Sequence, residues 1–208
     1  MSHWRWEIAL VLLTGVAHFL VAGWLDLRLV FIVGISLFWI GYVAMRARTD
    51  PSVLGEWGFT RRNLGKSLAW LAPAALGVVI TFAVYGALTG RLLLHEHIAP
   101  IFLLYPVYGL VQQFLVVALL AGNLHKHTRI PKPAVIAVTA LIFAAAHAPS
   151  LPLMAAALVL ATLTTSEYLR TRNLLALGLF HGWFATGLYF FALGRDPWIE
   201  VVSACLSP

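Results

Sequence analysis

The feature that most constrains this fold is a series of long apolar segments that follow one another along the whole chain. Seven can be marked, at about 7–25, 29–46, 67–89, 99–122, 133–148, 151–168 and 173–194. A helix needs about twenty apolar residues to cross the hydrocarbon core of a bilayer, and most of these segments approach that length. The chain is therefore predicted to be all-α, a single integral membrane domain over residues 1–208 that forms a polytopic bundle of about seven transmembrane helices.

Composition points to the same solvent. Hydrophobic residues make up 61% of the 208 residues and charged residues only 11%. A soluble domain of this size needs a charged surface, so a lipid bilayer is the expected partner. The net charge of +6 does not indicate nucleic-acid binding, because the cations lie in short loops rather than in a patch interleaved with aromatics. Cys205 is the only cysteine, which excludes an intrachain disulfide and a thiolate zinc site.

The basic residues alternate from loop to loop, as topology determinants do. If the N-terminus is cytoplasmic, 11 of the 14 Lys and Arg residues lie on the inner side. The inner set is Arg5, Arg46, Arg48, Arg61, Arg62, Lys66, Lys126, Arg129, Lys132, Arg170 and Arg172, and the outer set is Arg28, Arg91 and Arg195. The positive-inside rule then predicts an N-in, C-out topology, which suits a bacterial inner membrane. A stretch near 198–202 is too short and polar to count as an eighth span.

The longest inner connection covers residues 50–66. It mixes Trp57, Phe59 and Leu64 with three cations. This mixture suits a segment that lies at the interface of an anionic inner leaflet, and it fits a plain solvated loop equally well. Both alternatives stay open at this point.

Polar residues inside three separate apolar segments predict a buried polar cluster. Gln112 and Gln113 are adjacent in the fourth segment, His147 ends the fifth, and His181 lies in the seventh. An amide in hydrocarbon is unfavourable unless a protein group forms a hydrogen bond with it, so these side chains are expected to lie in contact with one another. Pro106 is expected to break or begin the fourth helix, about two turns before the glutamine pair.

Each of these residues also has an ordinary structural explanation. A single Gln in a span is most often a helix–helix contact that contributes on the order of 1 kcal/mol. A single His is more often a packed group than a ligand, and His18 in the first segment is interpreted in that way. The loop groups His95-Glu96-His97 and His125-Lys126-His127 are interpreted as interfacial polar residues, so no metal site is predicted. Small residues at 144–146 and at Gly178, Gly182 and Gly187 predict close helix packing.

The motifs and their order resemble one family. The order of elements is similar to the CAAX prenyl protease and bacteriocin-processing family of intramembrane proteases, also called the abortive-infection family. That family carries Glu-Glu-x-x-x-Arg, then Phe-x-x-x-His, then His-x-x-x-Asn on successive core helices. The resemblance covers about 50–190 and includes the stretches 57–64 and 168–175 that precede two of the spans.

The resemblance implies a site that holds and activates a water molecule, but the match is partial. In the family, a motif-one glutamate and both histidines hold the water, and the second histidine and the asparagine stabilise an oxyanion. Phe143 and His147 fit the second motif fully, and His181 fits the start of the third. The departures from the family pattern are Gln112 and Gln113 in place of the glutamates, Val117 in place of the arginine, and Ala185 in place of the asparagine.

These departures all act against the family's reaction. A neutral carboxamide cannot take a proton from water near neutral pH, so the general base is missing. Ala185 removes an amide donor, and the loss of one oxyanion donor typically lowers the rate by about 100–1000-fold. His147 or His181 could act as a base only in a mechanism unlike the family's. Glu167, near the inner end of the sixth segment, is expected to lie too far away to substitute.

Two functions are compatible with this pattern. The first is a non-catalytic homologue, a pseudoenzyme that binds a membrane-protein partner, a lipid or a pigment-like ligand, or that serves as an assembly subunit of a larger membrane complex. The second is an active intramembrane endopeptidase with an altered site that uses His147 and His181 with a bound water or metal. A transporter or an unrelated seven-helix protein is less favoured, and the sequence identifies no cofactor.

Overall fold

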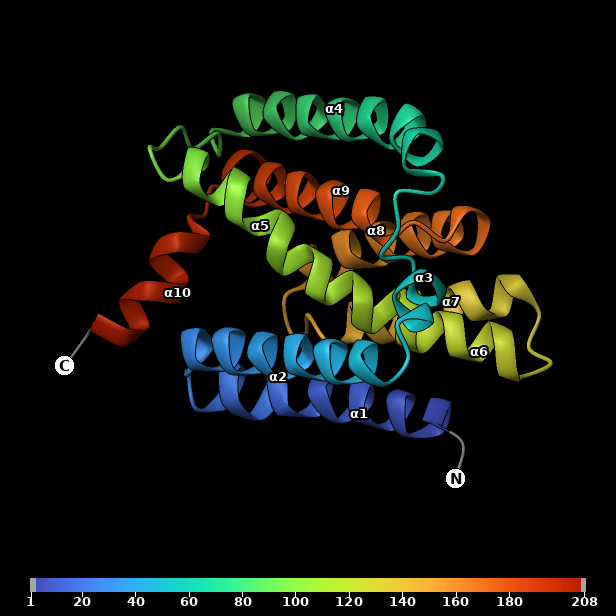
Figure 1. Ribbon diagram of the computed structural model, residues 1–208. Coiled ribbons are helices and arrows are strands. Elements are labelled where there is room, and N and C mark those ends of the chain that lie inside the picture. The colour runs from blue at the N-terminus through green and yellow to red at the C-terminus, as the bar shows by residue number, and fades with distance from the viewer. Residues whose placement is uncertain (1–2, 207–208) are drawn as a thin grey trace.

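The chain folds into a bundle of helices (Figure 1). The computed structural model describes residues 3–206, and side chains are described for residues 3–201. Every regular element in this described part is helical, which confirms the predicted all-α class. The helices are α1 (His3–Ala17), α2 (Arg28–Thr49), α3 (Ser52–Trp57), α4 (Leu64–Thr89), α5 (Ile98–Gln113), α6 (Gly122–His127), α7 (Lys132–Ala145), α8 (Leu151–Thr171), α9 (Leu174–Gly187) and α10 (Pro197–Leu206). Three π-helical stretches extend or join them, η1 (His18–Trp24), η2 (Phe114–Ala121) and η3 (Leu188–Leu193).

Six continuous helical stretches are long and apolar enough to cross a membrane. They are His3–Trp24, Arg28–Thr49, Leu64–Thr89, Ile98–His127, Leu151–Thr171 and Leu174–Leu193. The remaining predicted segment forms α7, an apolar helix of 14 residues, which is short for a span. The chain is therefore an integral multi-pass membrane protein, while a total of seven spans and the N-in, C-out orientation stay predictions.

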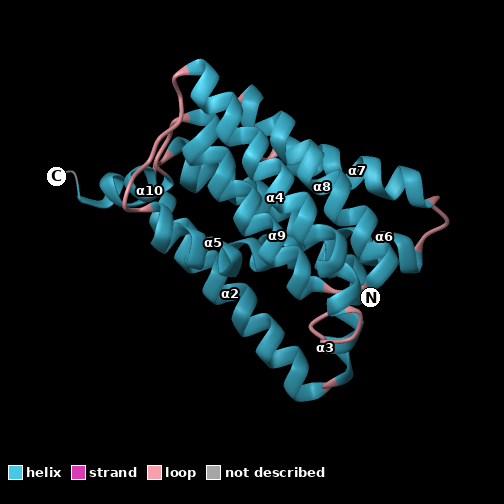
Figure 2. Cartoon of the chain, turned by 90° about the horizontal axis from the view of Figure 1, so that it is seen from above, coloured by secondary structure: helices cyan, strands magenta, loops and turns pink. Residues whose placement is uncertain are grey.

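The helices are arranged around α5, which runs obliquely through the bundle. The hairpin of α1 and α2 forms a layer on one side of α5, and α4 packs with α9 on the other side (Figures 1 and 2). Helices α7 and α8 pair with each other. Helix α10 leaves the bundle at the end opposite the N-terminus (Figure 1). The residues of α5 and α9 thus lie in the interior, where the predicted polar cluster is expected.

Glycines bring α5 and α9 into backbone contact. A Cβ added to Gly182 would lie 2.4 Å from the backbone nitrogen of Pro106, and one added to Gly178 would lie 2.8 Å from Leu110 Cβ. A Cβ on Gly187 would lie 3.1 Å from Val79 Cγ2 on α4. The close approach predicted for these three glycines is confirmed.

The prediction that Pro106 breaks or begins a helix is wrong. Pro106 lies inside α5, which starts at Ile98 and continues to Gln113. Neighbouring helices and local adjustments allow proline within a membrane helix. Here the absence of a side chain on Gly182 leaves room for the proline ring, because a Cβ on Gly182 would lie only 2.6 Å from Pro106 Cδ.

The connection 50–66 is docked on the protein. Trp57 is buried, with its ring centroid 5.1 Å from that of Phe114. The side-chain amide of Asn173, itself fully buried, donates to the carbonyls of Thr60 at 2.8 Å and Arg62 at 2.9 Å. A plain solvated loop does not describe Trp57, while the position of the segment at the lipid interface stays a prediction. The segment packs inward because its free carbonyls find donors at the start of α9.

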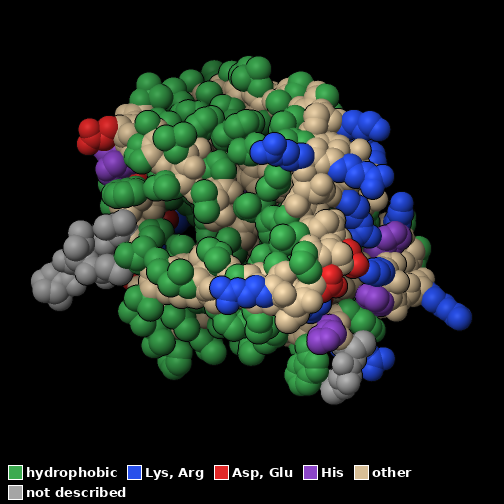
Figure 3. All heavy atoms as spheres, viewed as in Figure 1, with side chains coloured by type: hydrophobic (Ala, Val, Ile, Leu, Met, Phe, Trp, Pro, Cys, Tyr) green, Lys and Arg blue, Asp and Glu red, His purple; other side chains and the backbone are tan. Residues whose placement is uncertain are grey.

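Most basic side chains gather at one end of the molecule, the right-hand end in Figure 3, with a broad apolar surface beside them. This is the end at which the N-terminus, α3 and α6 lie (Figure 1). Glu7 of α1 is buried near this end, where it accepts from the Tyr42 hydroxyl at 2.7 Å and from the Asn123 amide at 2.6 Å. Arg46 lies 3.4 Å from the same carboxylate. These bonds fasten the first two helices to α6.

Candidate functional site

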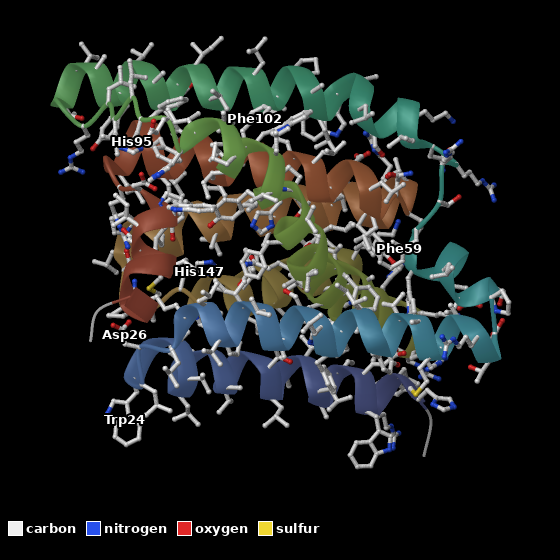
Figure 4. The ribbon with its side chains drawn as sticks, turned by 60° about the vertical axis from the view of Figure 1, so that its left-hand side comes forward. Trp24, Asp26, Phe59, His95, Phe102 and His147 are labelled. Atoms are coloured by element: carbon white, nitrogen blue, oxygen red, sulfur yellow. The ribbon has the colours of Figure 1, made fainter. Side chains whose placement is uncertain are left out.

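The structure brings the predicted polar residues to one place inside the bundle. Gln112 and Gln113 are the last two residues of α5, immediately before the π-helical stretch η2. His181 lies in the middle of α9, the helix in backbone contact with α5. His147 follows the end of α7, and Figure 4 shows it inside the bundle, between the layer of α1 and α2 and helix α9.

Gln113 and His181 are directly bonded. Gln113 is fully buried, His181 is 4% exposed, and Gln113 Nε2 lies 2.9 Å from His181 Nδ1. An amide nitrogen can only donate, so Nδ1 of His181 is the acceptor. A neutral imidazole carries its single proton on the other nitrogen, which here is Nε2. The Gln113 amide thereby sets the tautomer of His181.

Phe143 connects the two histidines. Its ring centroid lies 4.7 Å from that of His147 and 5.9 Å from that of His181, and both contacts are edge-on. His147 Nδ1 lies 2.8 Å from the carbonyl oxygen of Phe143. Since a carbonyl can only accept, Nδ1 of His147 is the donor and its Nε2 carries the lone pair. The two histidines therefore have opposite tautomers, and His147 alone has a basic nitrogen without a partner among the described residues.

Gln112 faces His147 across a cavity. A space of about 120 Å³ is lined by both residues together with His18, Tyr108 and apolar groups of α1, α2, η2 and α7. A smaller space of about 40 Å³ is lined by Gln112 and both histidines. It is large enough for two or three water molecules, because one needs roughly 10–15 Å³. None of the described residues that line either space is acidic.

Two buried oxygens of the cluster lack a donor. Gln112 Oε1 and Gln113 Oε1 have no hydrogen-bond partner among the described residues. The Tyr108 side chain lines the larger space together with Gln112. A buried amide oxygen without a donor is costly, about 1–3 kcal/mol, so each is a place where an N–H or O–H group would be stabilised.

The positions that differ from the family pattern are apolar in their surroundings as well. Val117 is fully buried within η2 and belongs to the hydrophobic core. Ala185 is 6% exposed and lines the smaller space beside His181. No charge partner for a carboxylate stands at 117, and no side-chain donor stands at 185. Glu167 lies elsewhere, where it accepts from Trp70 and pairs with Arg170 at 2.7 Å.

Two residues that line the site, Tyr108 and His18, were not assigned to it from the sequence. Tyr108 lies one helical turn before Gln112, and this i, i+4 spacing is a signal that could have identified it. His18 packs edge-on against Phe31, with centroids 5.2 Å apart, as expected for a packed histidine. It also lines the larger cavity, which nothing in the local sequence indicates, because its neighbours there come from α2 and α7.

Comparison with known proteins bears on the same region. A family model described as Type II CAAX prenyl endopeptidase Rce1-like matches residues 94–187. The matched range contains the glutamine pair, both histidines and the positions 117 and 185. Searches of curated proteins and of solved structures each returned no match. The match confirms the resemblance that the motifs indicated: residues 94–187 of this membrane protein, somewhat under half of the chain, are similar to the Rce1-like type II CAAX prenyl endopeptidases.

Proposed function

We propose that this protein keeps the membrane scaffold of the Rce1-like family without its peptidase reaction, and that it acts as a binding or assembly subunit in the membrane. The observation that carries the proposal is the Gln113–His181 bond at 2.9 Å. It places an uncharged amide where the family's reaction needs a carboxylate, and it uses the histidine nitrogen that a base would need.

The protonation pattern supports a site without a general base. Gln112 and Gln113 have no usable basicity. In His181, Nδ1 accepts from Gln113 and Nε2 carries the proton, so neither nitrogen is free to take a proton from water. An alanine at 185 supplies no donor to a developing oxyanion. The base and one oxyanion donor are therefore both absent from the positions where the family has them.

The cavity supports binding by an apolar group. Its volume of about 120 Å³ is below the roughly 300–1,000 Å³ typical of pockets for whole small molecules. It suits a large side chain of a partner helix or a length of acyl chain. The free oxygen of Gln112 at its edge favours an occupant that brings an N–H or O–H donor to that point. The gathering of cations at one end supports an inner-membrane location with that end in the cytoplasm.

An active endopeptidase with an altered site is the second candidate. It is favoured by one observation: His147 Nε2 carries a lone pair, and His147 borders the small polar space together with His181 and Gln112. A water in that space could be deprotonated by His147 alone. This mechanism would differ from the family's because no carboxylate takes part.

The two candidates are separated by parallel experiments on the full chain. The protein is purified in mild detergent and its partners are identified by mass spectrometry, while processing of co-expressed membrane substrates is followed by gel. We expect a stoichiometric partner or lipid and no processing. His147→Ala and His181→Ala are compared with His125→Ala, which lies on α6 outside the site. Processing that the two site variants abolish and the control retains would overturn the proposal.

A further inference from the structure

A second polar cluster lies at the end of the molecule where α10 begins. His95 and His97 belong to the connection between α4 and α5, and Asp196 immediately precedes α10. His97 Nδ1 lies 2.7 Å and His95 Nδ1 3.3 Å from the same oxygen, Asp196 Oδ2. Figure 4 shows His95 at this end, apart from His147 in the interior.

The backbone holds the two loops of this cluster together. The Leu93 N–H donates to the Phe190 carbonyl at 2.9 Å, which ties the α4–α5 connection to the end of the last span. Gly194, with φ +64°, lies so close to Arg91 that an added Cβ would be 2.8 Å from the Arg91 carbonyl oxygen. The convergence of the two histidines on Asp196 therefore follows from the fold rather than from free side-chain movement.

Asp196 is oriented for a ligand on one side only. Its side chain is 6% exposed, and Oδ1 accepts the backbone N–H of Trp198 at 2.9 Å, which caps the start of α10. The other oxygen, Oδ2, is directed at the two imidazoles. His97, in turn, packs its ring against Trp198 with centroids 5.6 Å apart. The carboxylate and the second histidine are thus both held in place by α10.

The cluster brings lone pairs together. The backbone N–H of His97 lies 3.3 Å from His95 Nδ1, which is a long contact. A neutral imidazole has one lone pair, so a metal ion bound at His95 Nδ1 would take the place of this contact. His95 Nδ1 also lies 3.3 Å from Asp196 Oδ2, and a cation between these two atoms would be attracted by both.

We propose that His95, His97 and Asp196 bind a divalent transition-metal ion of the Zn²⁺ class, which fastens α10 to the α4–α5 connection. Two imidazole nitrogens and one carboxylate oxygen are common zinc ligands, with the fourth position open. The three ligand atoms lie within 4.8 Å of one another. Tetrahedral bonds to zinc of about 2.0–2.1 Å separate the ligand atoms by about 3.3 Å. The His95–Asp196 separation meets this value, and the His97–Asp196 separation would open by about 0.6 Å.

The chain contains a matched control for the histidine spacing. His125 and His127 have the same His-x-His pattern on α6, at the other end of the molecule. There, His127 stacks on Trp4 with centroids 5.4 Å apart, and no metal-ligating group of three is formed among the described residues. Spacing alone therefore does not make the site, and the difference between the two pairs is the shared carboxylate.

The test is a titration of chelator-treated full-length protein in detergent with ZnCl₂, by calorimetry and by the shift of the melting temperature. We expect one ion per chain and a rise in melting temperature on saturation. The double variant His95→Ala/His97→Ala and the variant Asp196→Asn are expected to lose at least about tenfold in affinity. The double variant His125→Ala/His127→Ala is expected to bind as the unaltered protein does.

Two results would show that there is no specific site: no saturable binding by the unaltered protein, or equal loss in the two double variants, which would mean nonspecific histidine coordination. Asp196→Asn guards against misfolding, because its amide oxygen can still cap α10 while the ligand charge is removed. Zinc binding that survives Asp196→Asn and His95→Ala/His97→Ala unchanged would place the ion elsewhere. The outcome is independent of whether the Gln–His cluster is catalytic.

Discussion

Replacing Gly182 by alanine is expected to separate the two helices that form the site. The new Cβ would lie 2.4 Å from the Pro106 backbone nitrogen and 2.6 Å from its Cα. Ordinary contacts between such atoms lie at about 3.5–4.0 Å, so α5 and α9 must move apart by about 1 Å. Overpacking of this kind typically costs about 1–3 kcal/mol. The same movement stretches the Gln113–His181 bond, now 2.9 Å, beyond hydrogen-bonding distance, which adds about 1–3 kcal/mol for two buried groups left unpaired.

The measurement is resistance to unfolding by heat or SDS in mild detergent. Gly77→Ala and Gly34→Ala are the matched controls, because both are helical glycines with nothing within 4 Å of an added Cβ. In these controls alanine is expected to be neutral or to stabilise by up to about 1 kcal/mol. Gly182→Ala should therefore fall below both controls by about 2–6 kcal/mol. Equal stability of Gly182→Ala and Gly77→Ala would refute the backbone contact between α5 and α9.

Three further substitutions test single interactions, the first two by the same unfolding assay and the third by proteolysis. Gln113→Leu leaves Nδ1 of His181 without a donor and is expected to cost about 1–3 kcal/mol, whereas an unchanged melting temperature would contradict the bond. Glu7→Ala removes the carboxylate that the buried Asn123 amide and Arg46 contact, and it should cost about 1–3 kcal/mol of stability. An unchanged unfolding midpoint would contradict a structural role for these contacts. Asn173→Ala removes two hydrogen bonds to the 50–66 connection and the N-terminal cap of α9. Protease cleavage of that connection should therefore become faster. An unchanged cleavage rate would show that the connection is not held by Asn173.

The spans were predictable because lipid imposes length and apolarity directly on the sequence. The glutamine pair and both histidines were predictable for a related reason: a polar group in hydrocarbon needs a partner, and few candidates exist. The end of the fourth span was harder, because the helical stretch continues to His127 through polar residues that carry no helix-breaking signal. The sequence shows where the apolar segment ends, but it does not show where the helix itself ends.

Contacts between distant residues account for what the sequence did not show. The burial of Trp57 was not visible in the local sequence, because its ring partner Phe114 lies in η2 and the Asn173 amide that holds the following loop lies at the start of α9. His97 and Asp196 are separated by 99 positions, so only the fold brings them together. Pro106 is a residue type that usually breaks helices, and it is accommodated within α5 because Gly182 on α9 has no side chain.

The substitutions in the site depend on one another, and a single reversal is expected to fail. Gln113→Glu would place a carboxylate in a fully buried position with Val117, not a cation, on the following turn. Its one polar partner is His181, whose proton would have to move to Nδ1 to donate to the carboxylate. A single neutral donor offsets only part of the several kcal/mol that removal of a charge from water costs, so the variant should be destabilised at neutral pH and recover part of its stability in acid, where the carboxyl group is neutral. It should remain unable to cleave membrane substrates, because Ala185 still supplies no oxyanion donor. A stable Gln113→Glu protein that cleaves substrate at neutral pH would show that the site lacks only its acid. The matched variant Gln112→Glu, at the edge of the larger cavity that Tyr108 also lines, should be less destabilised.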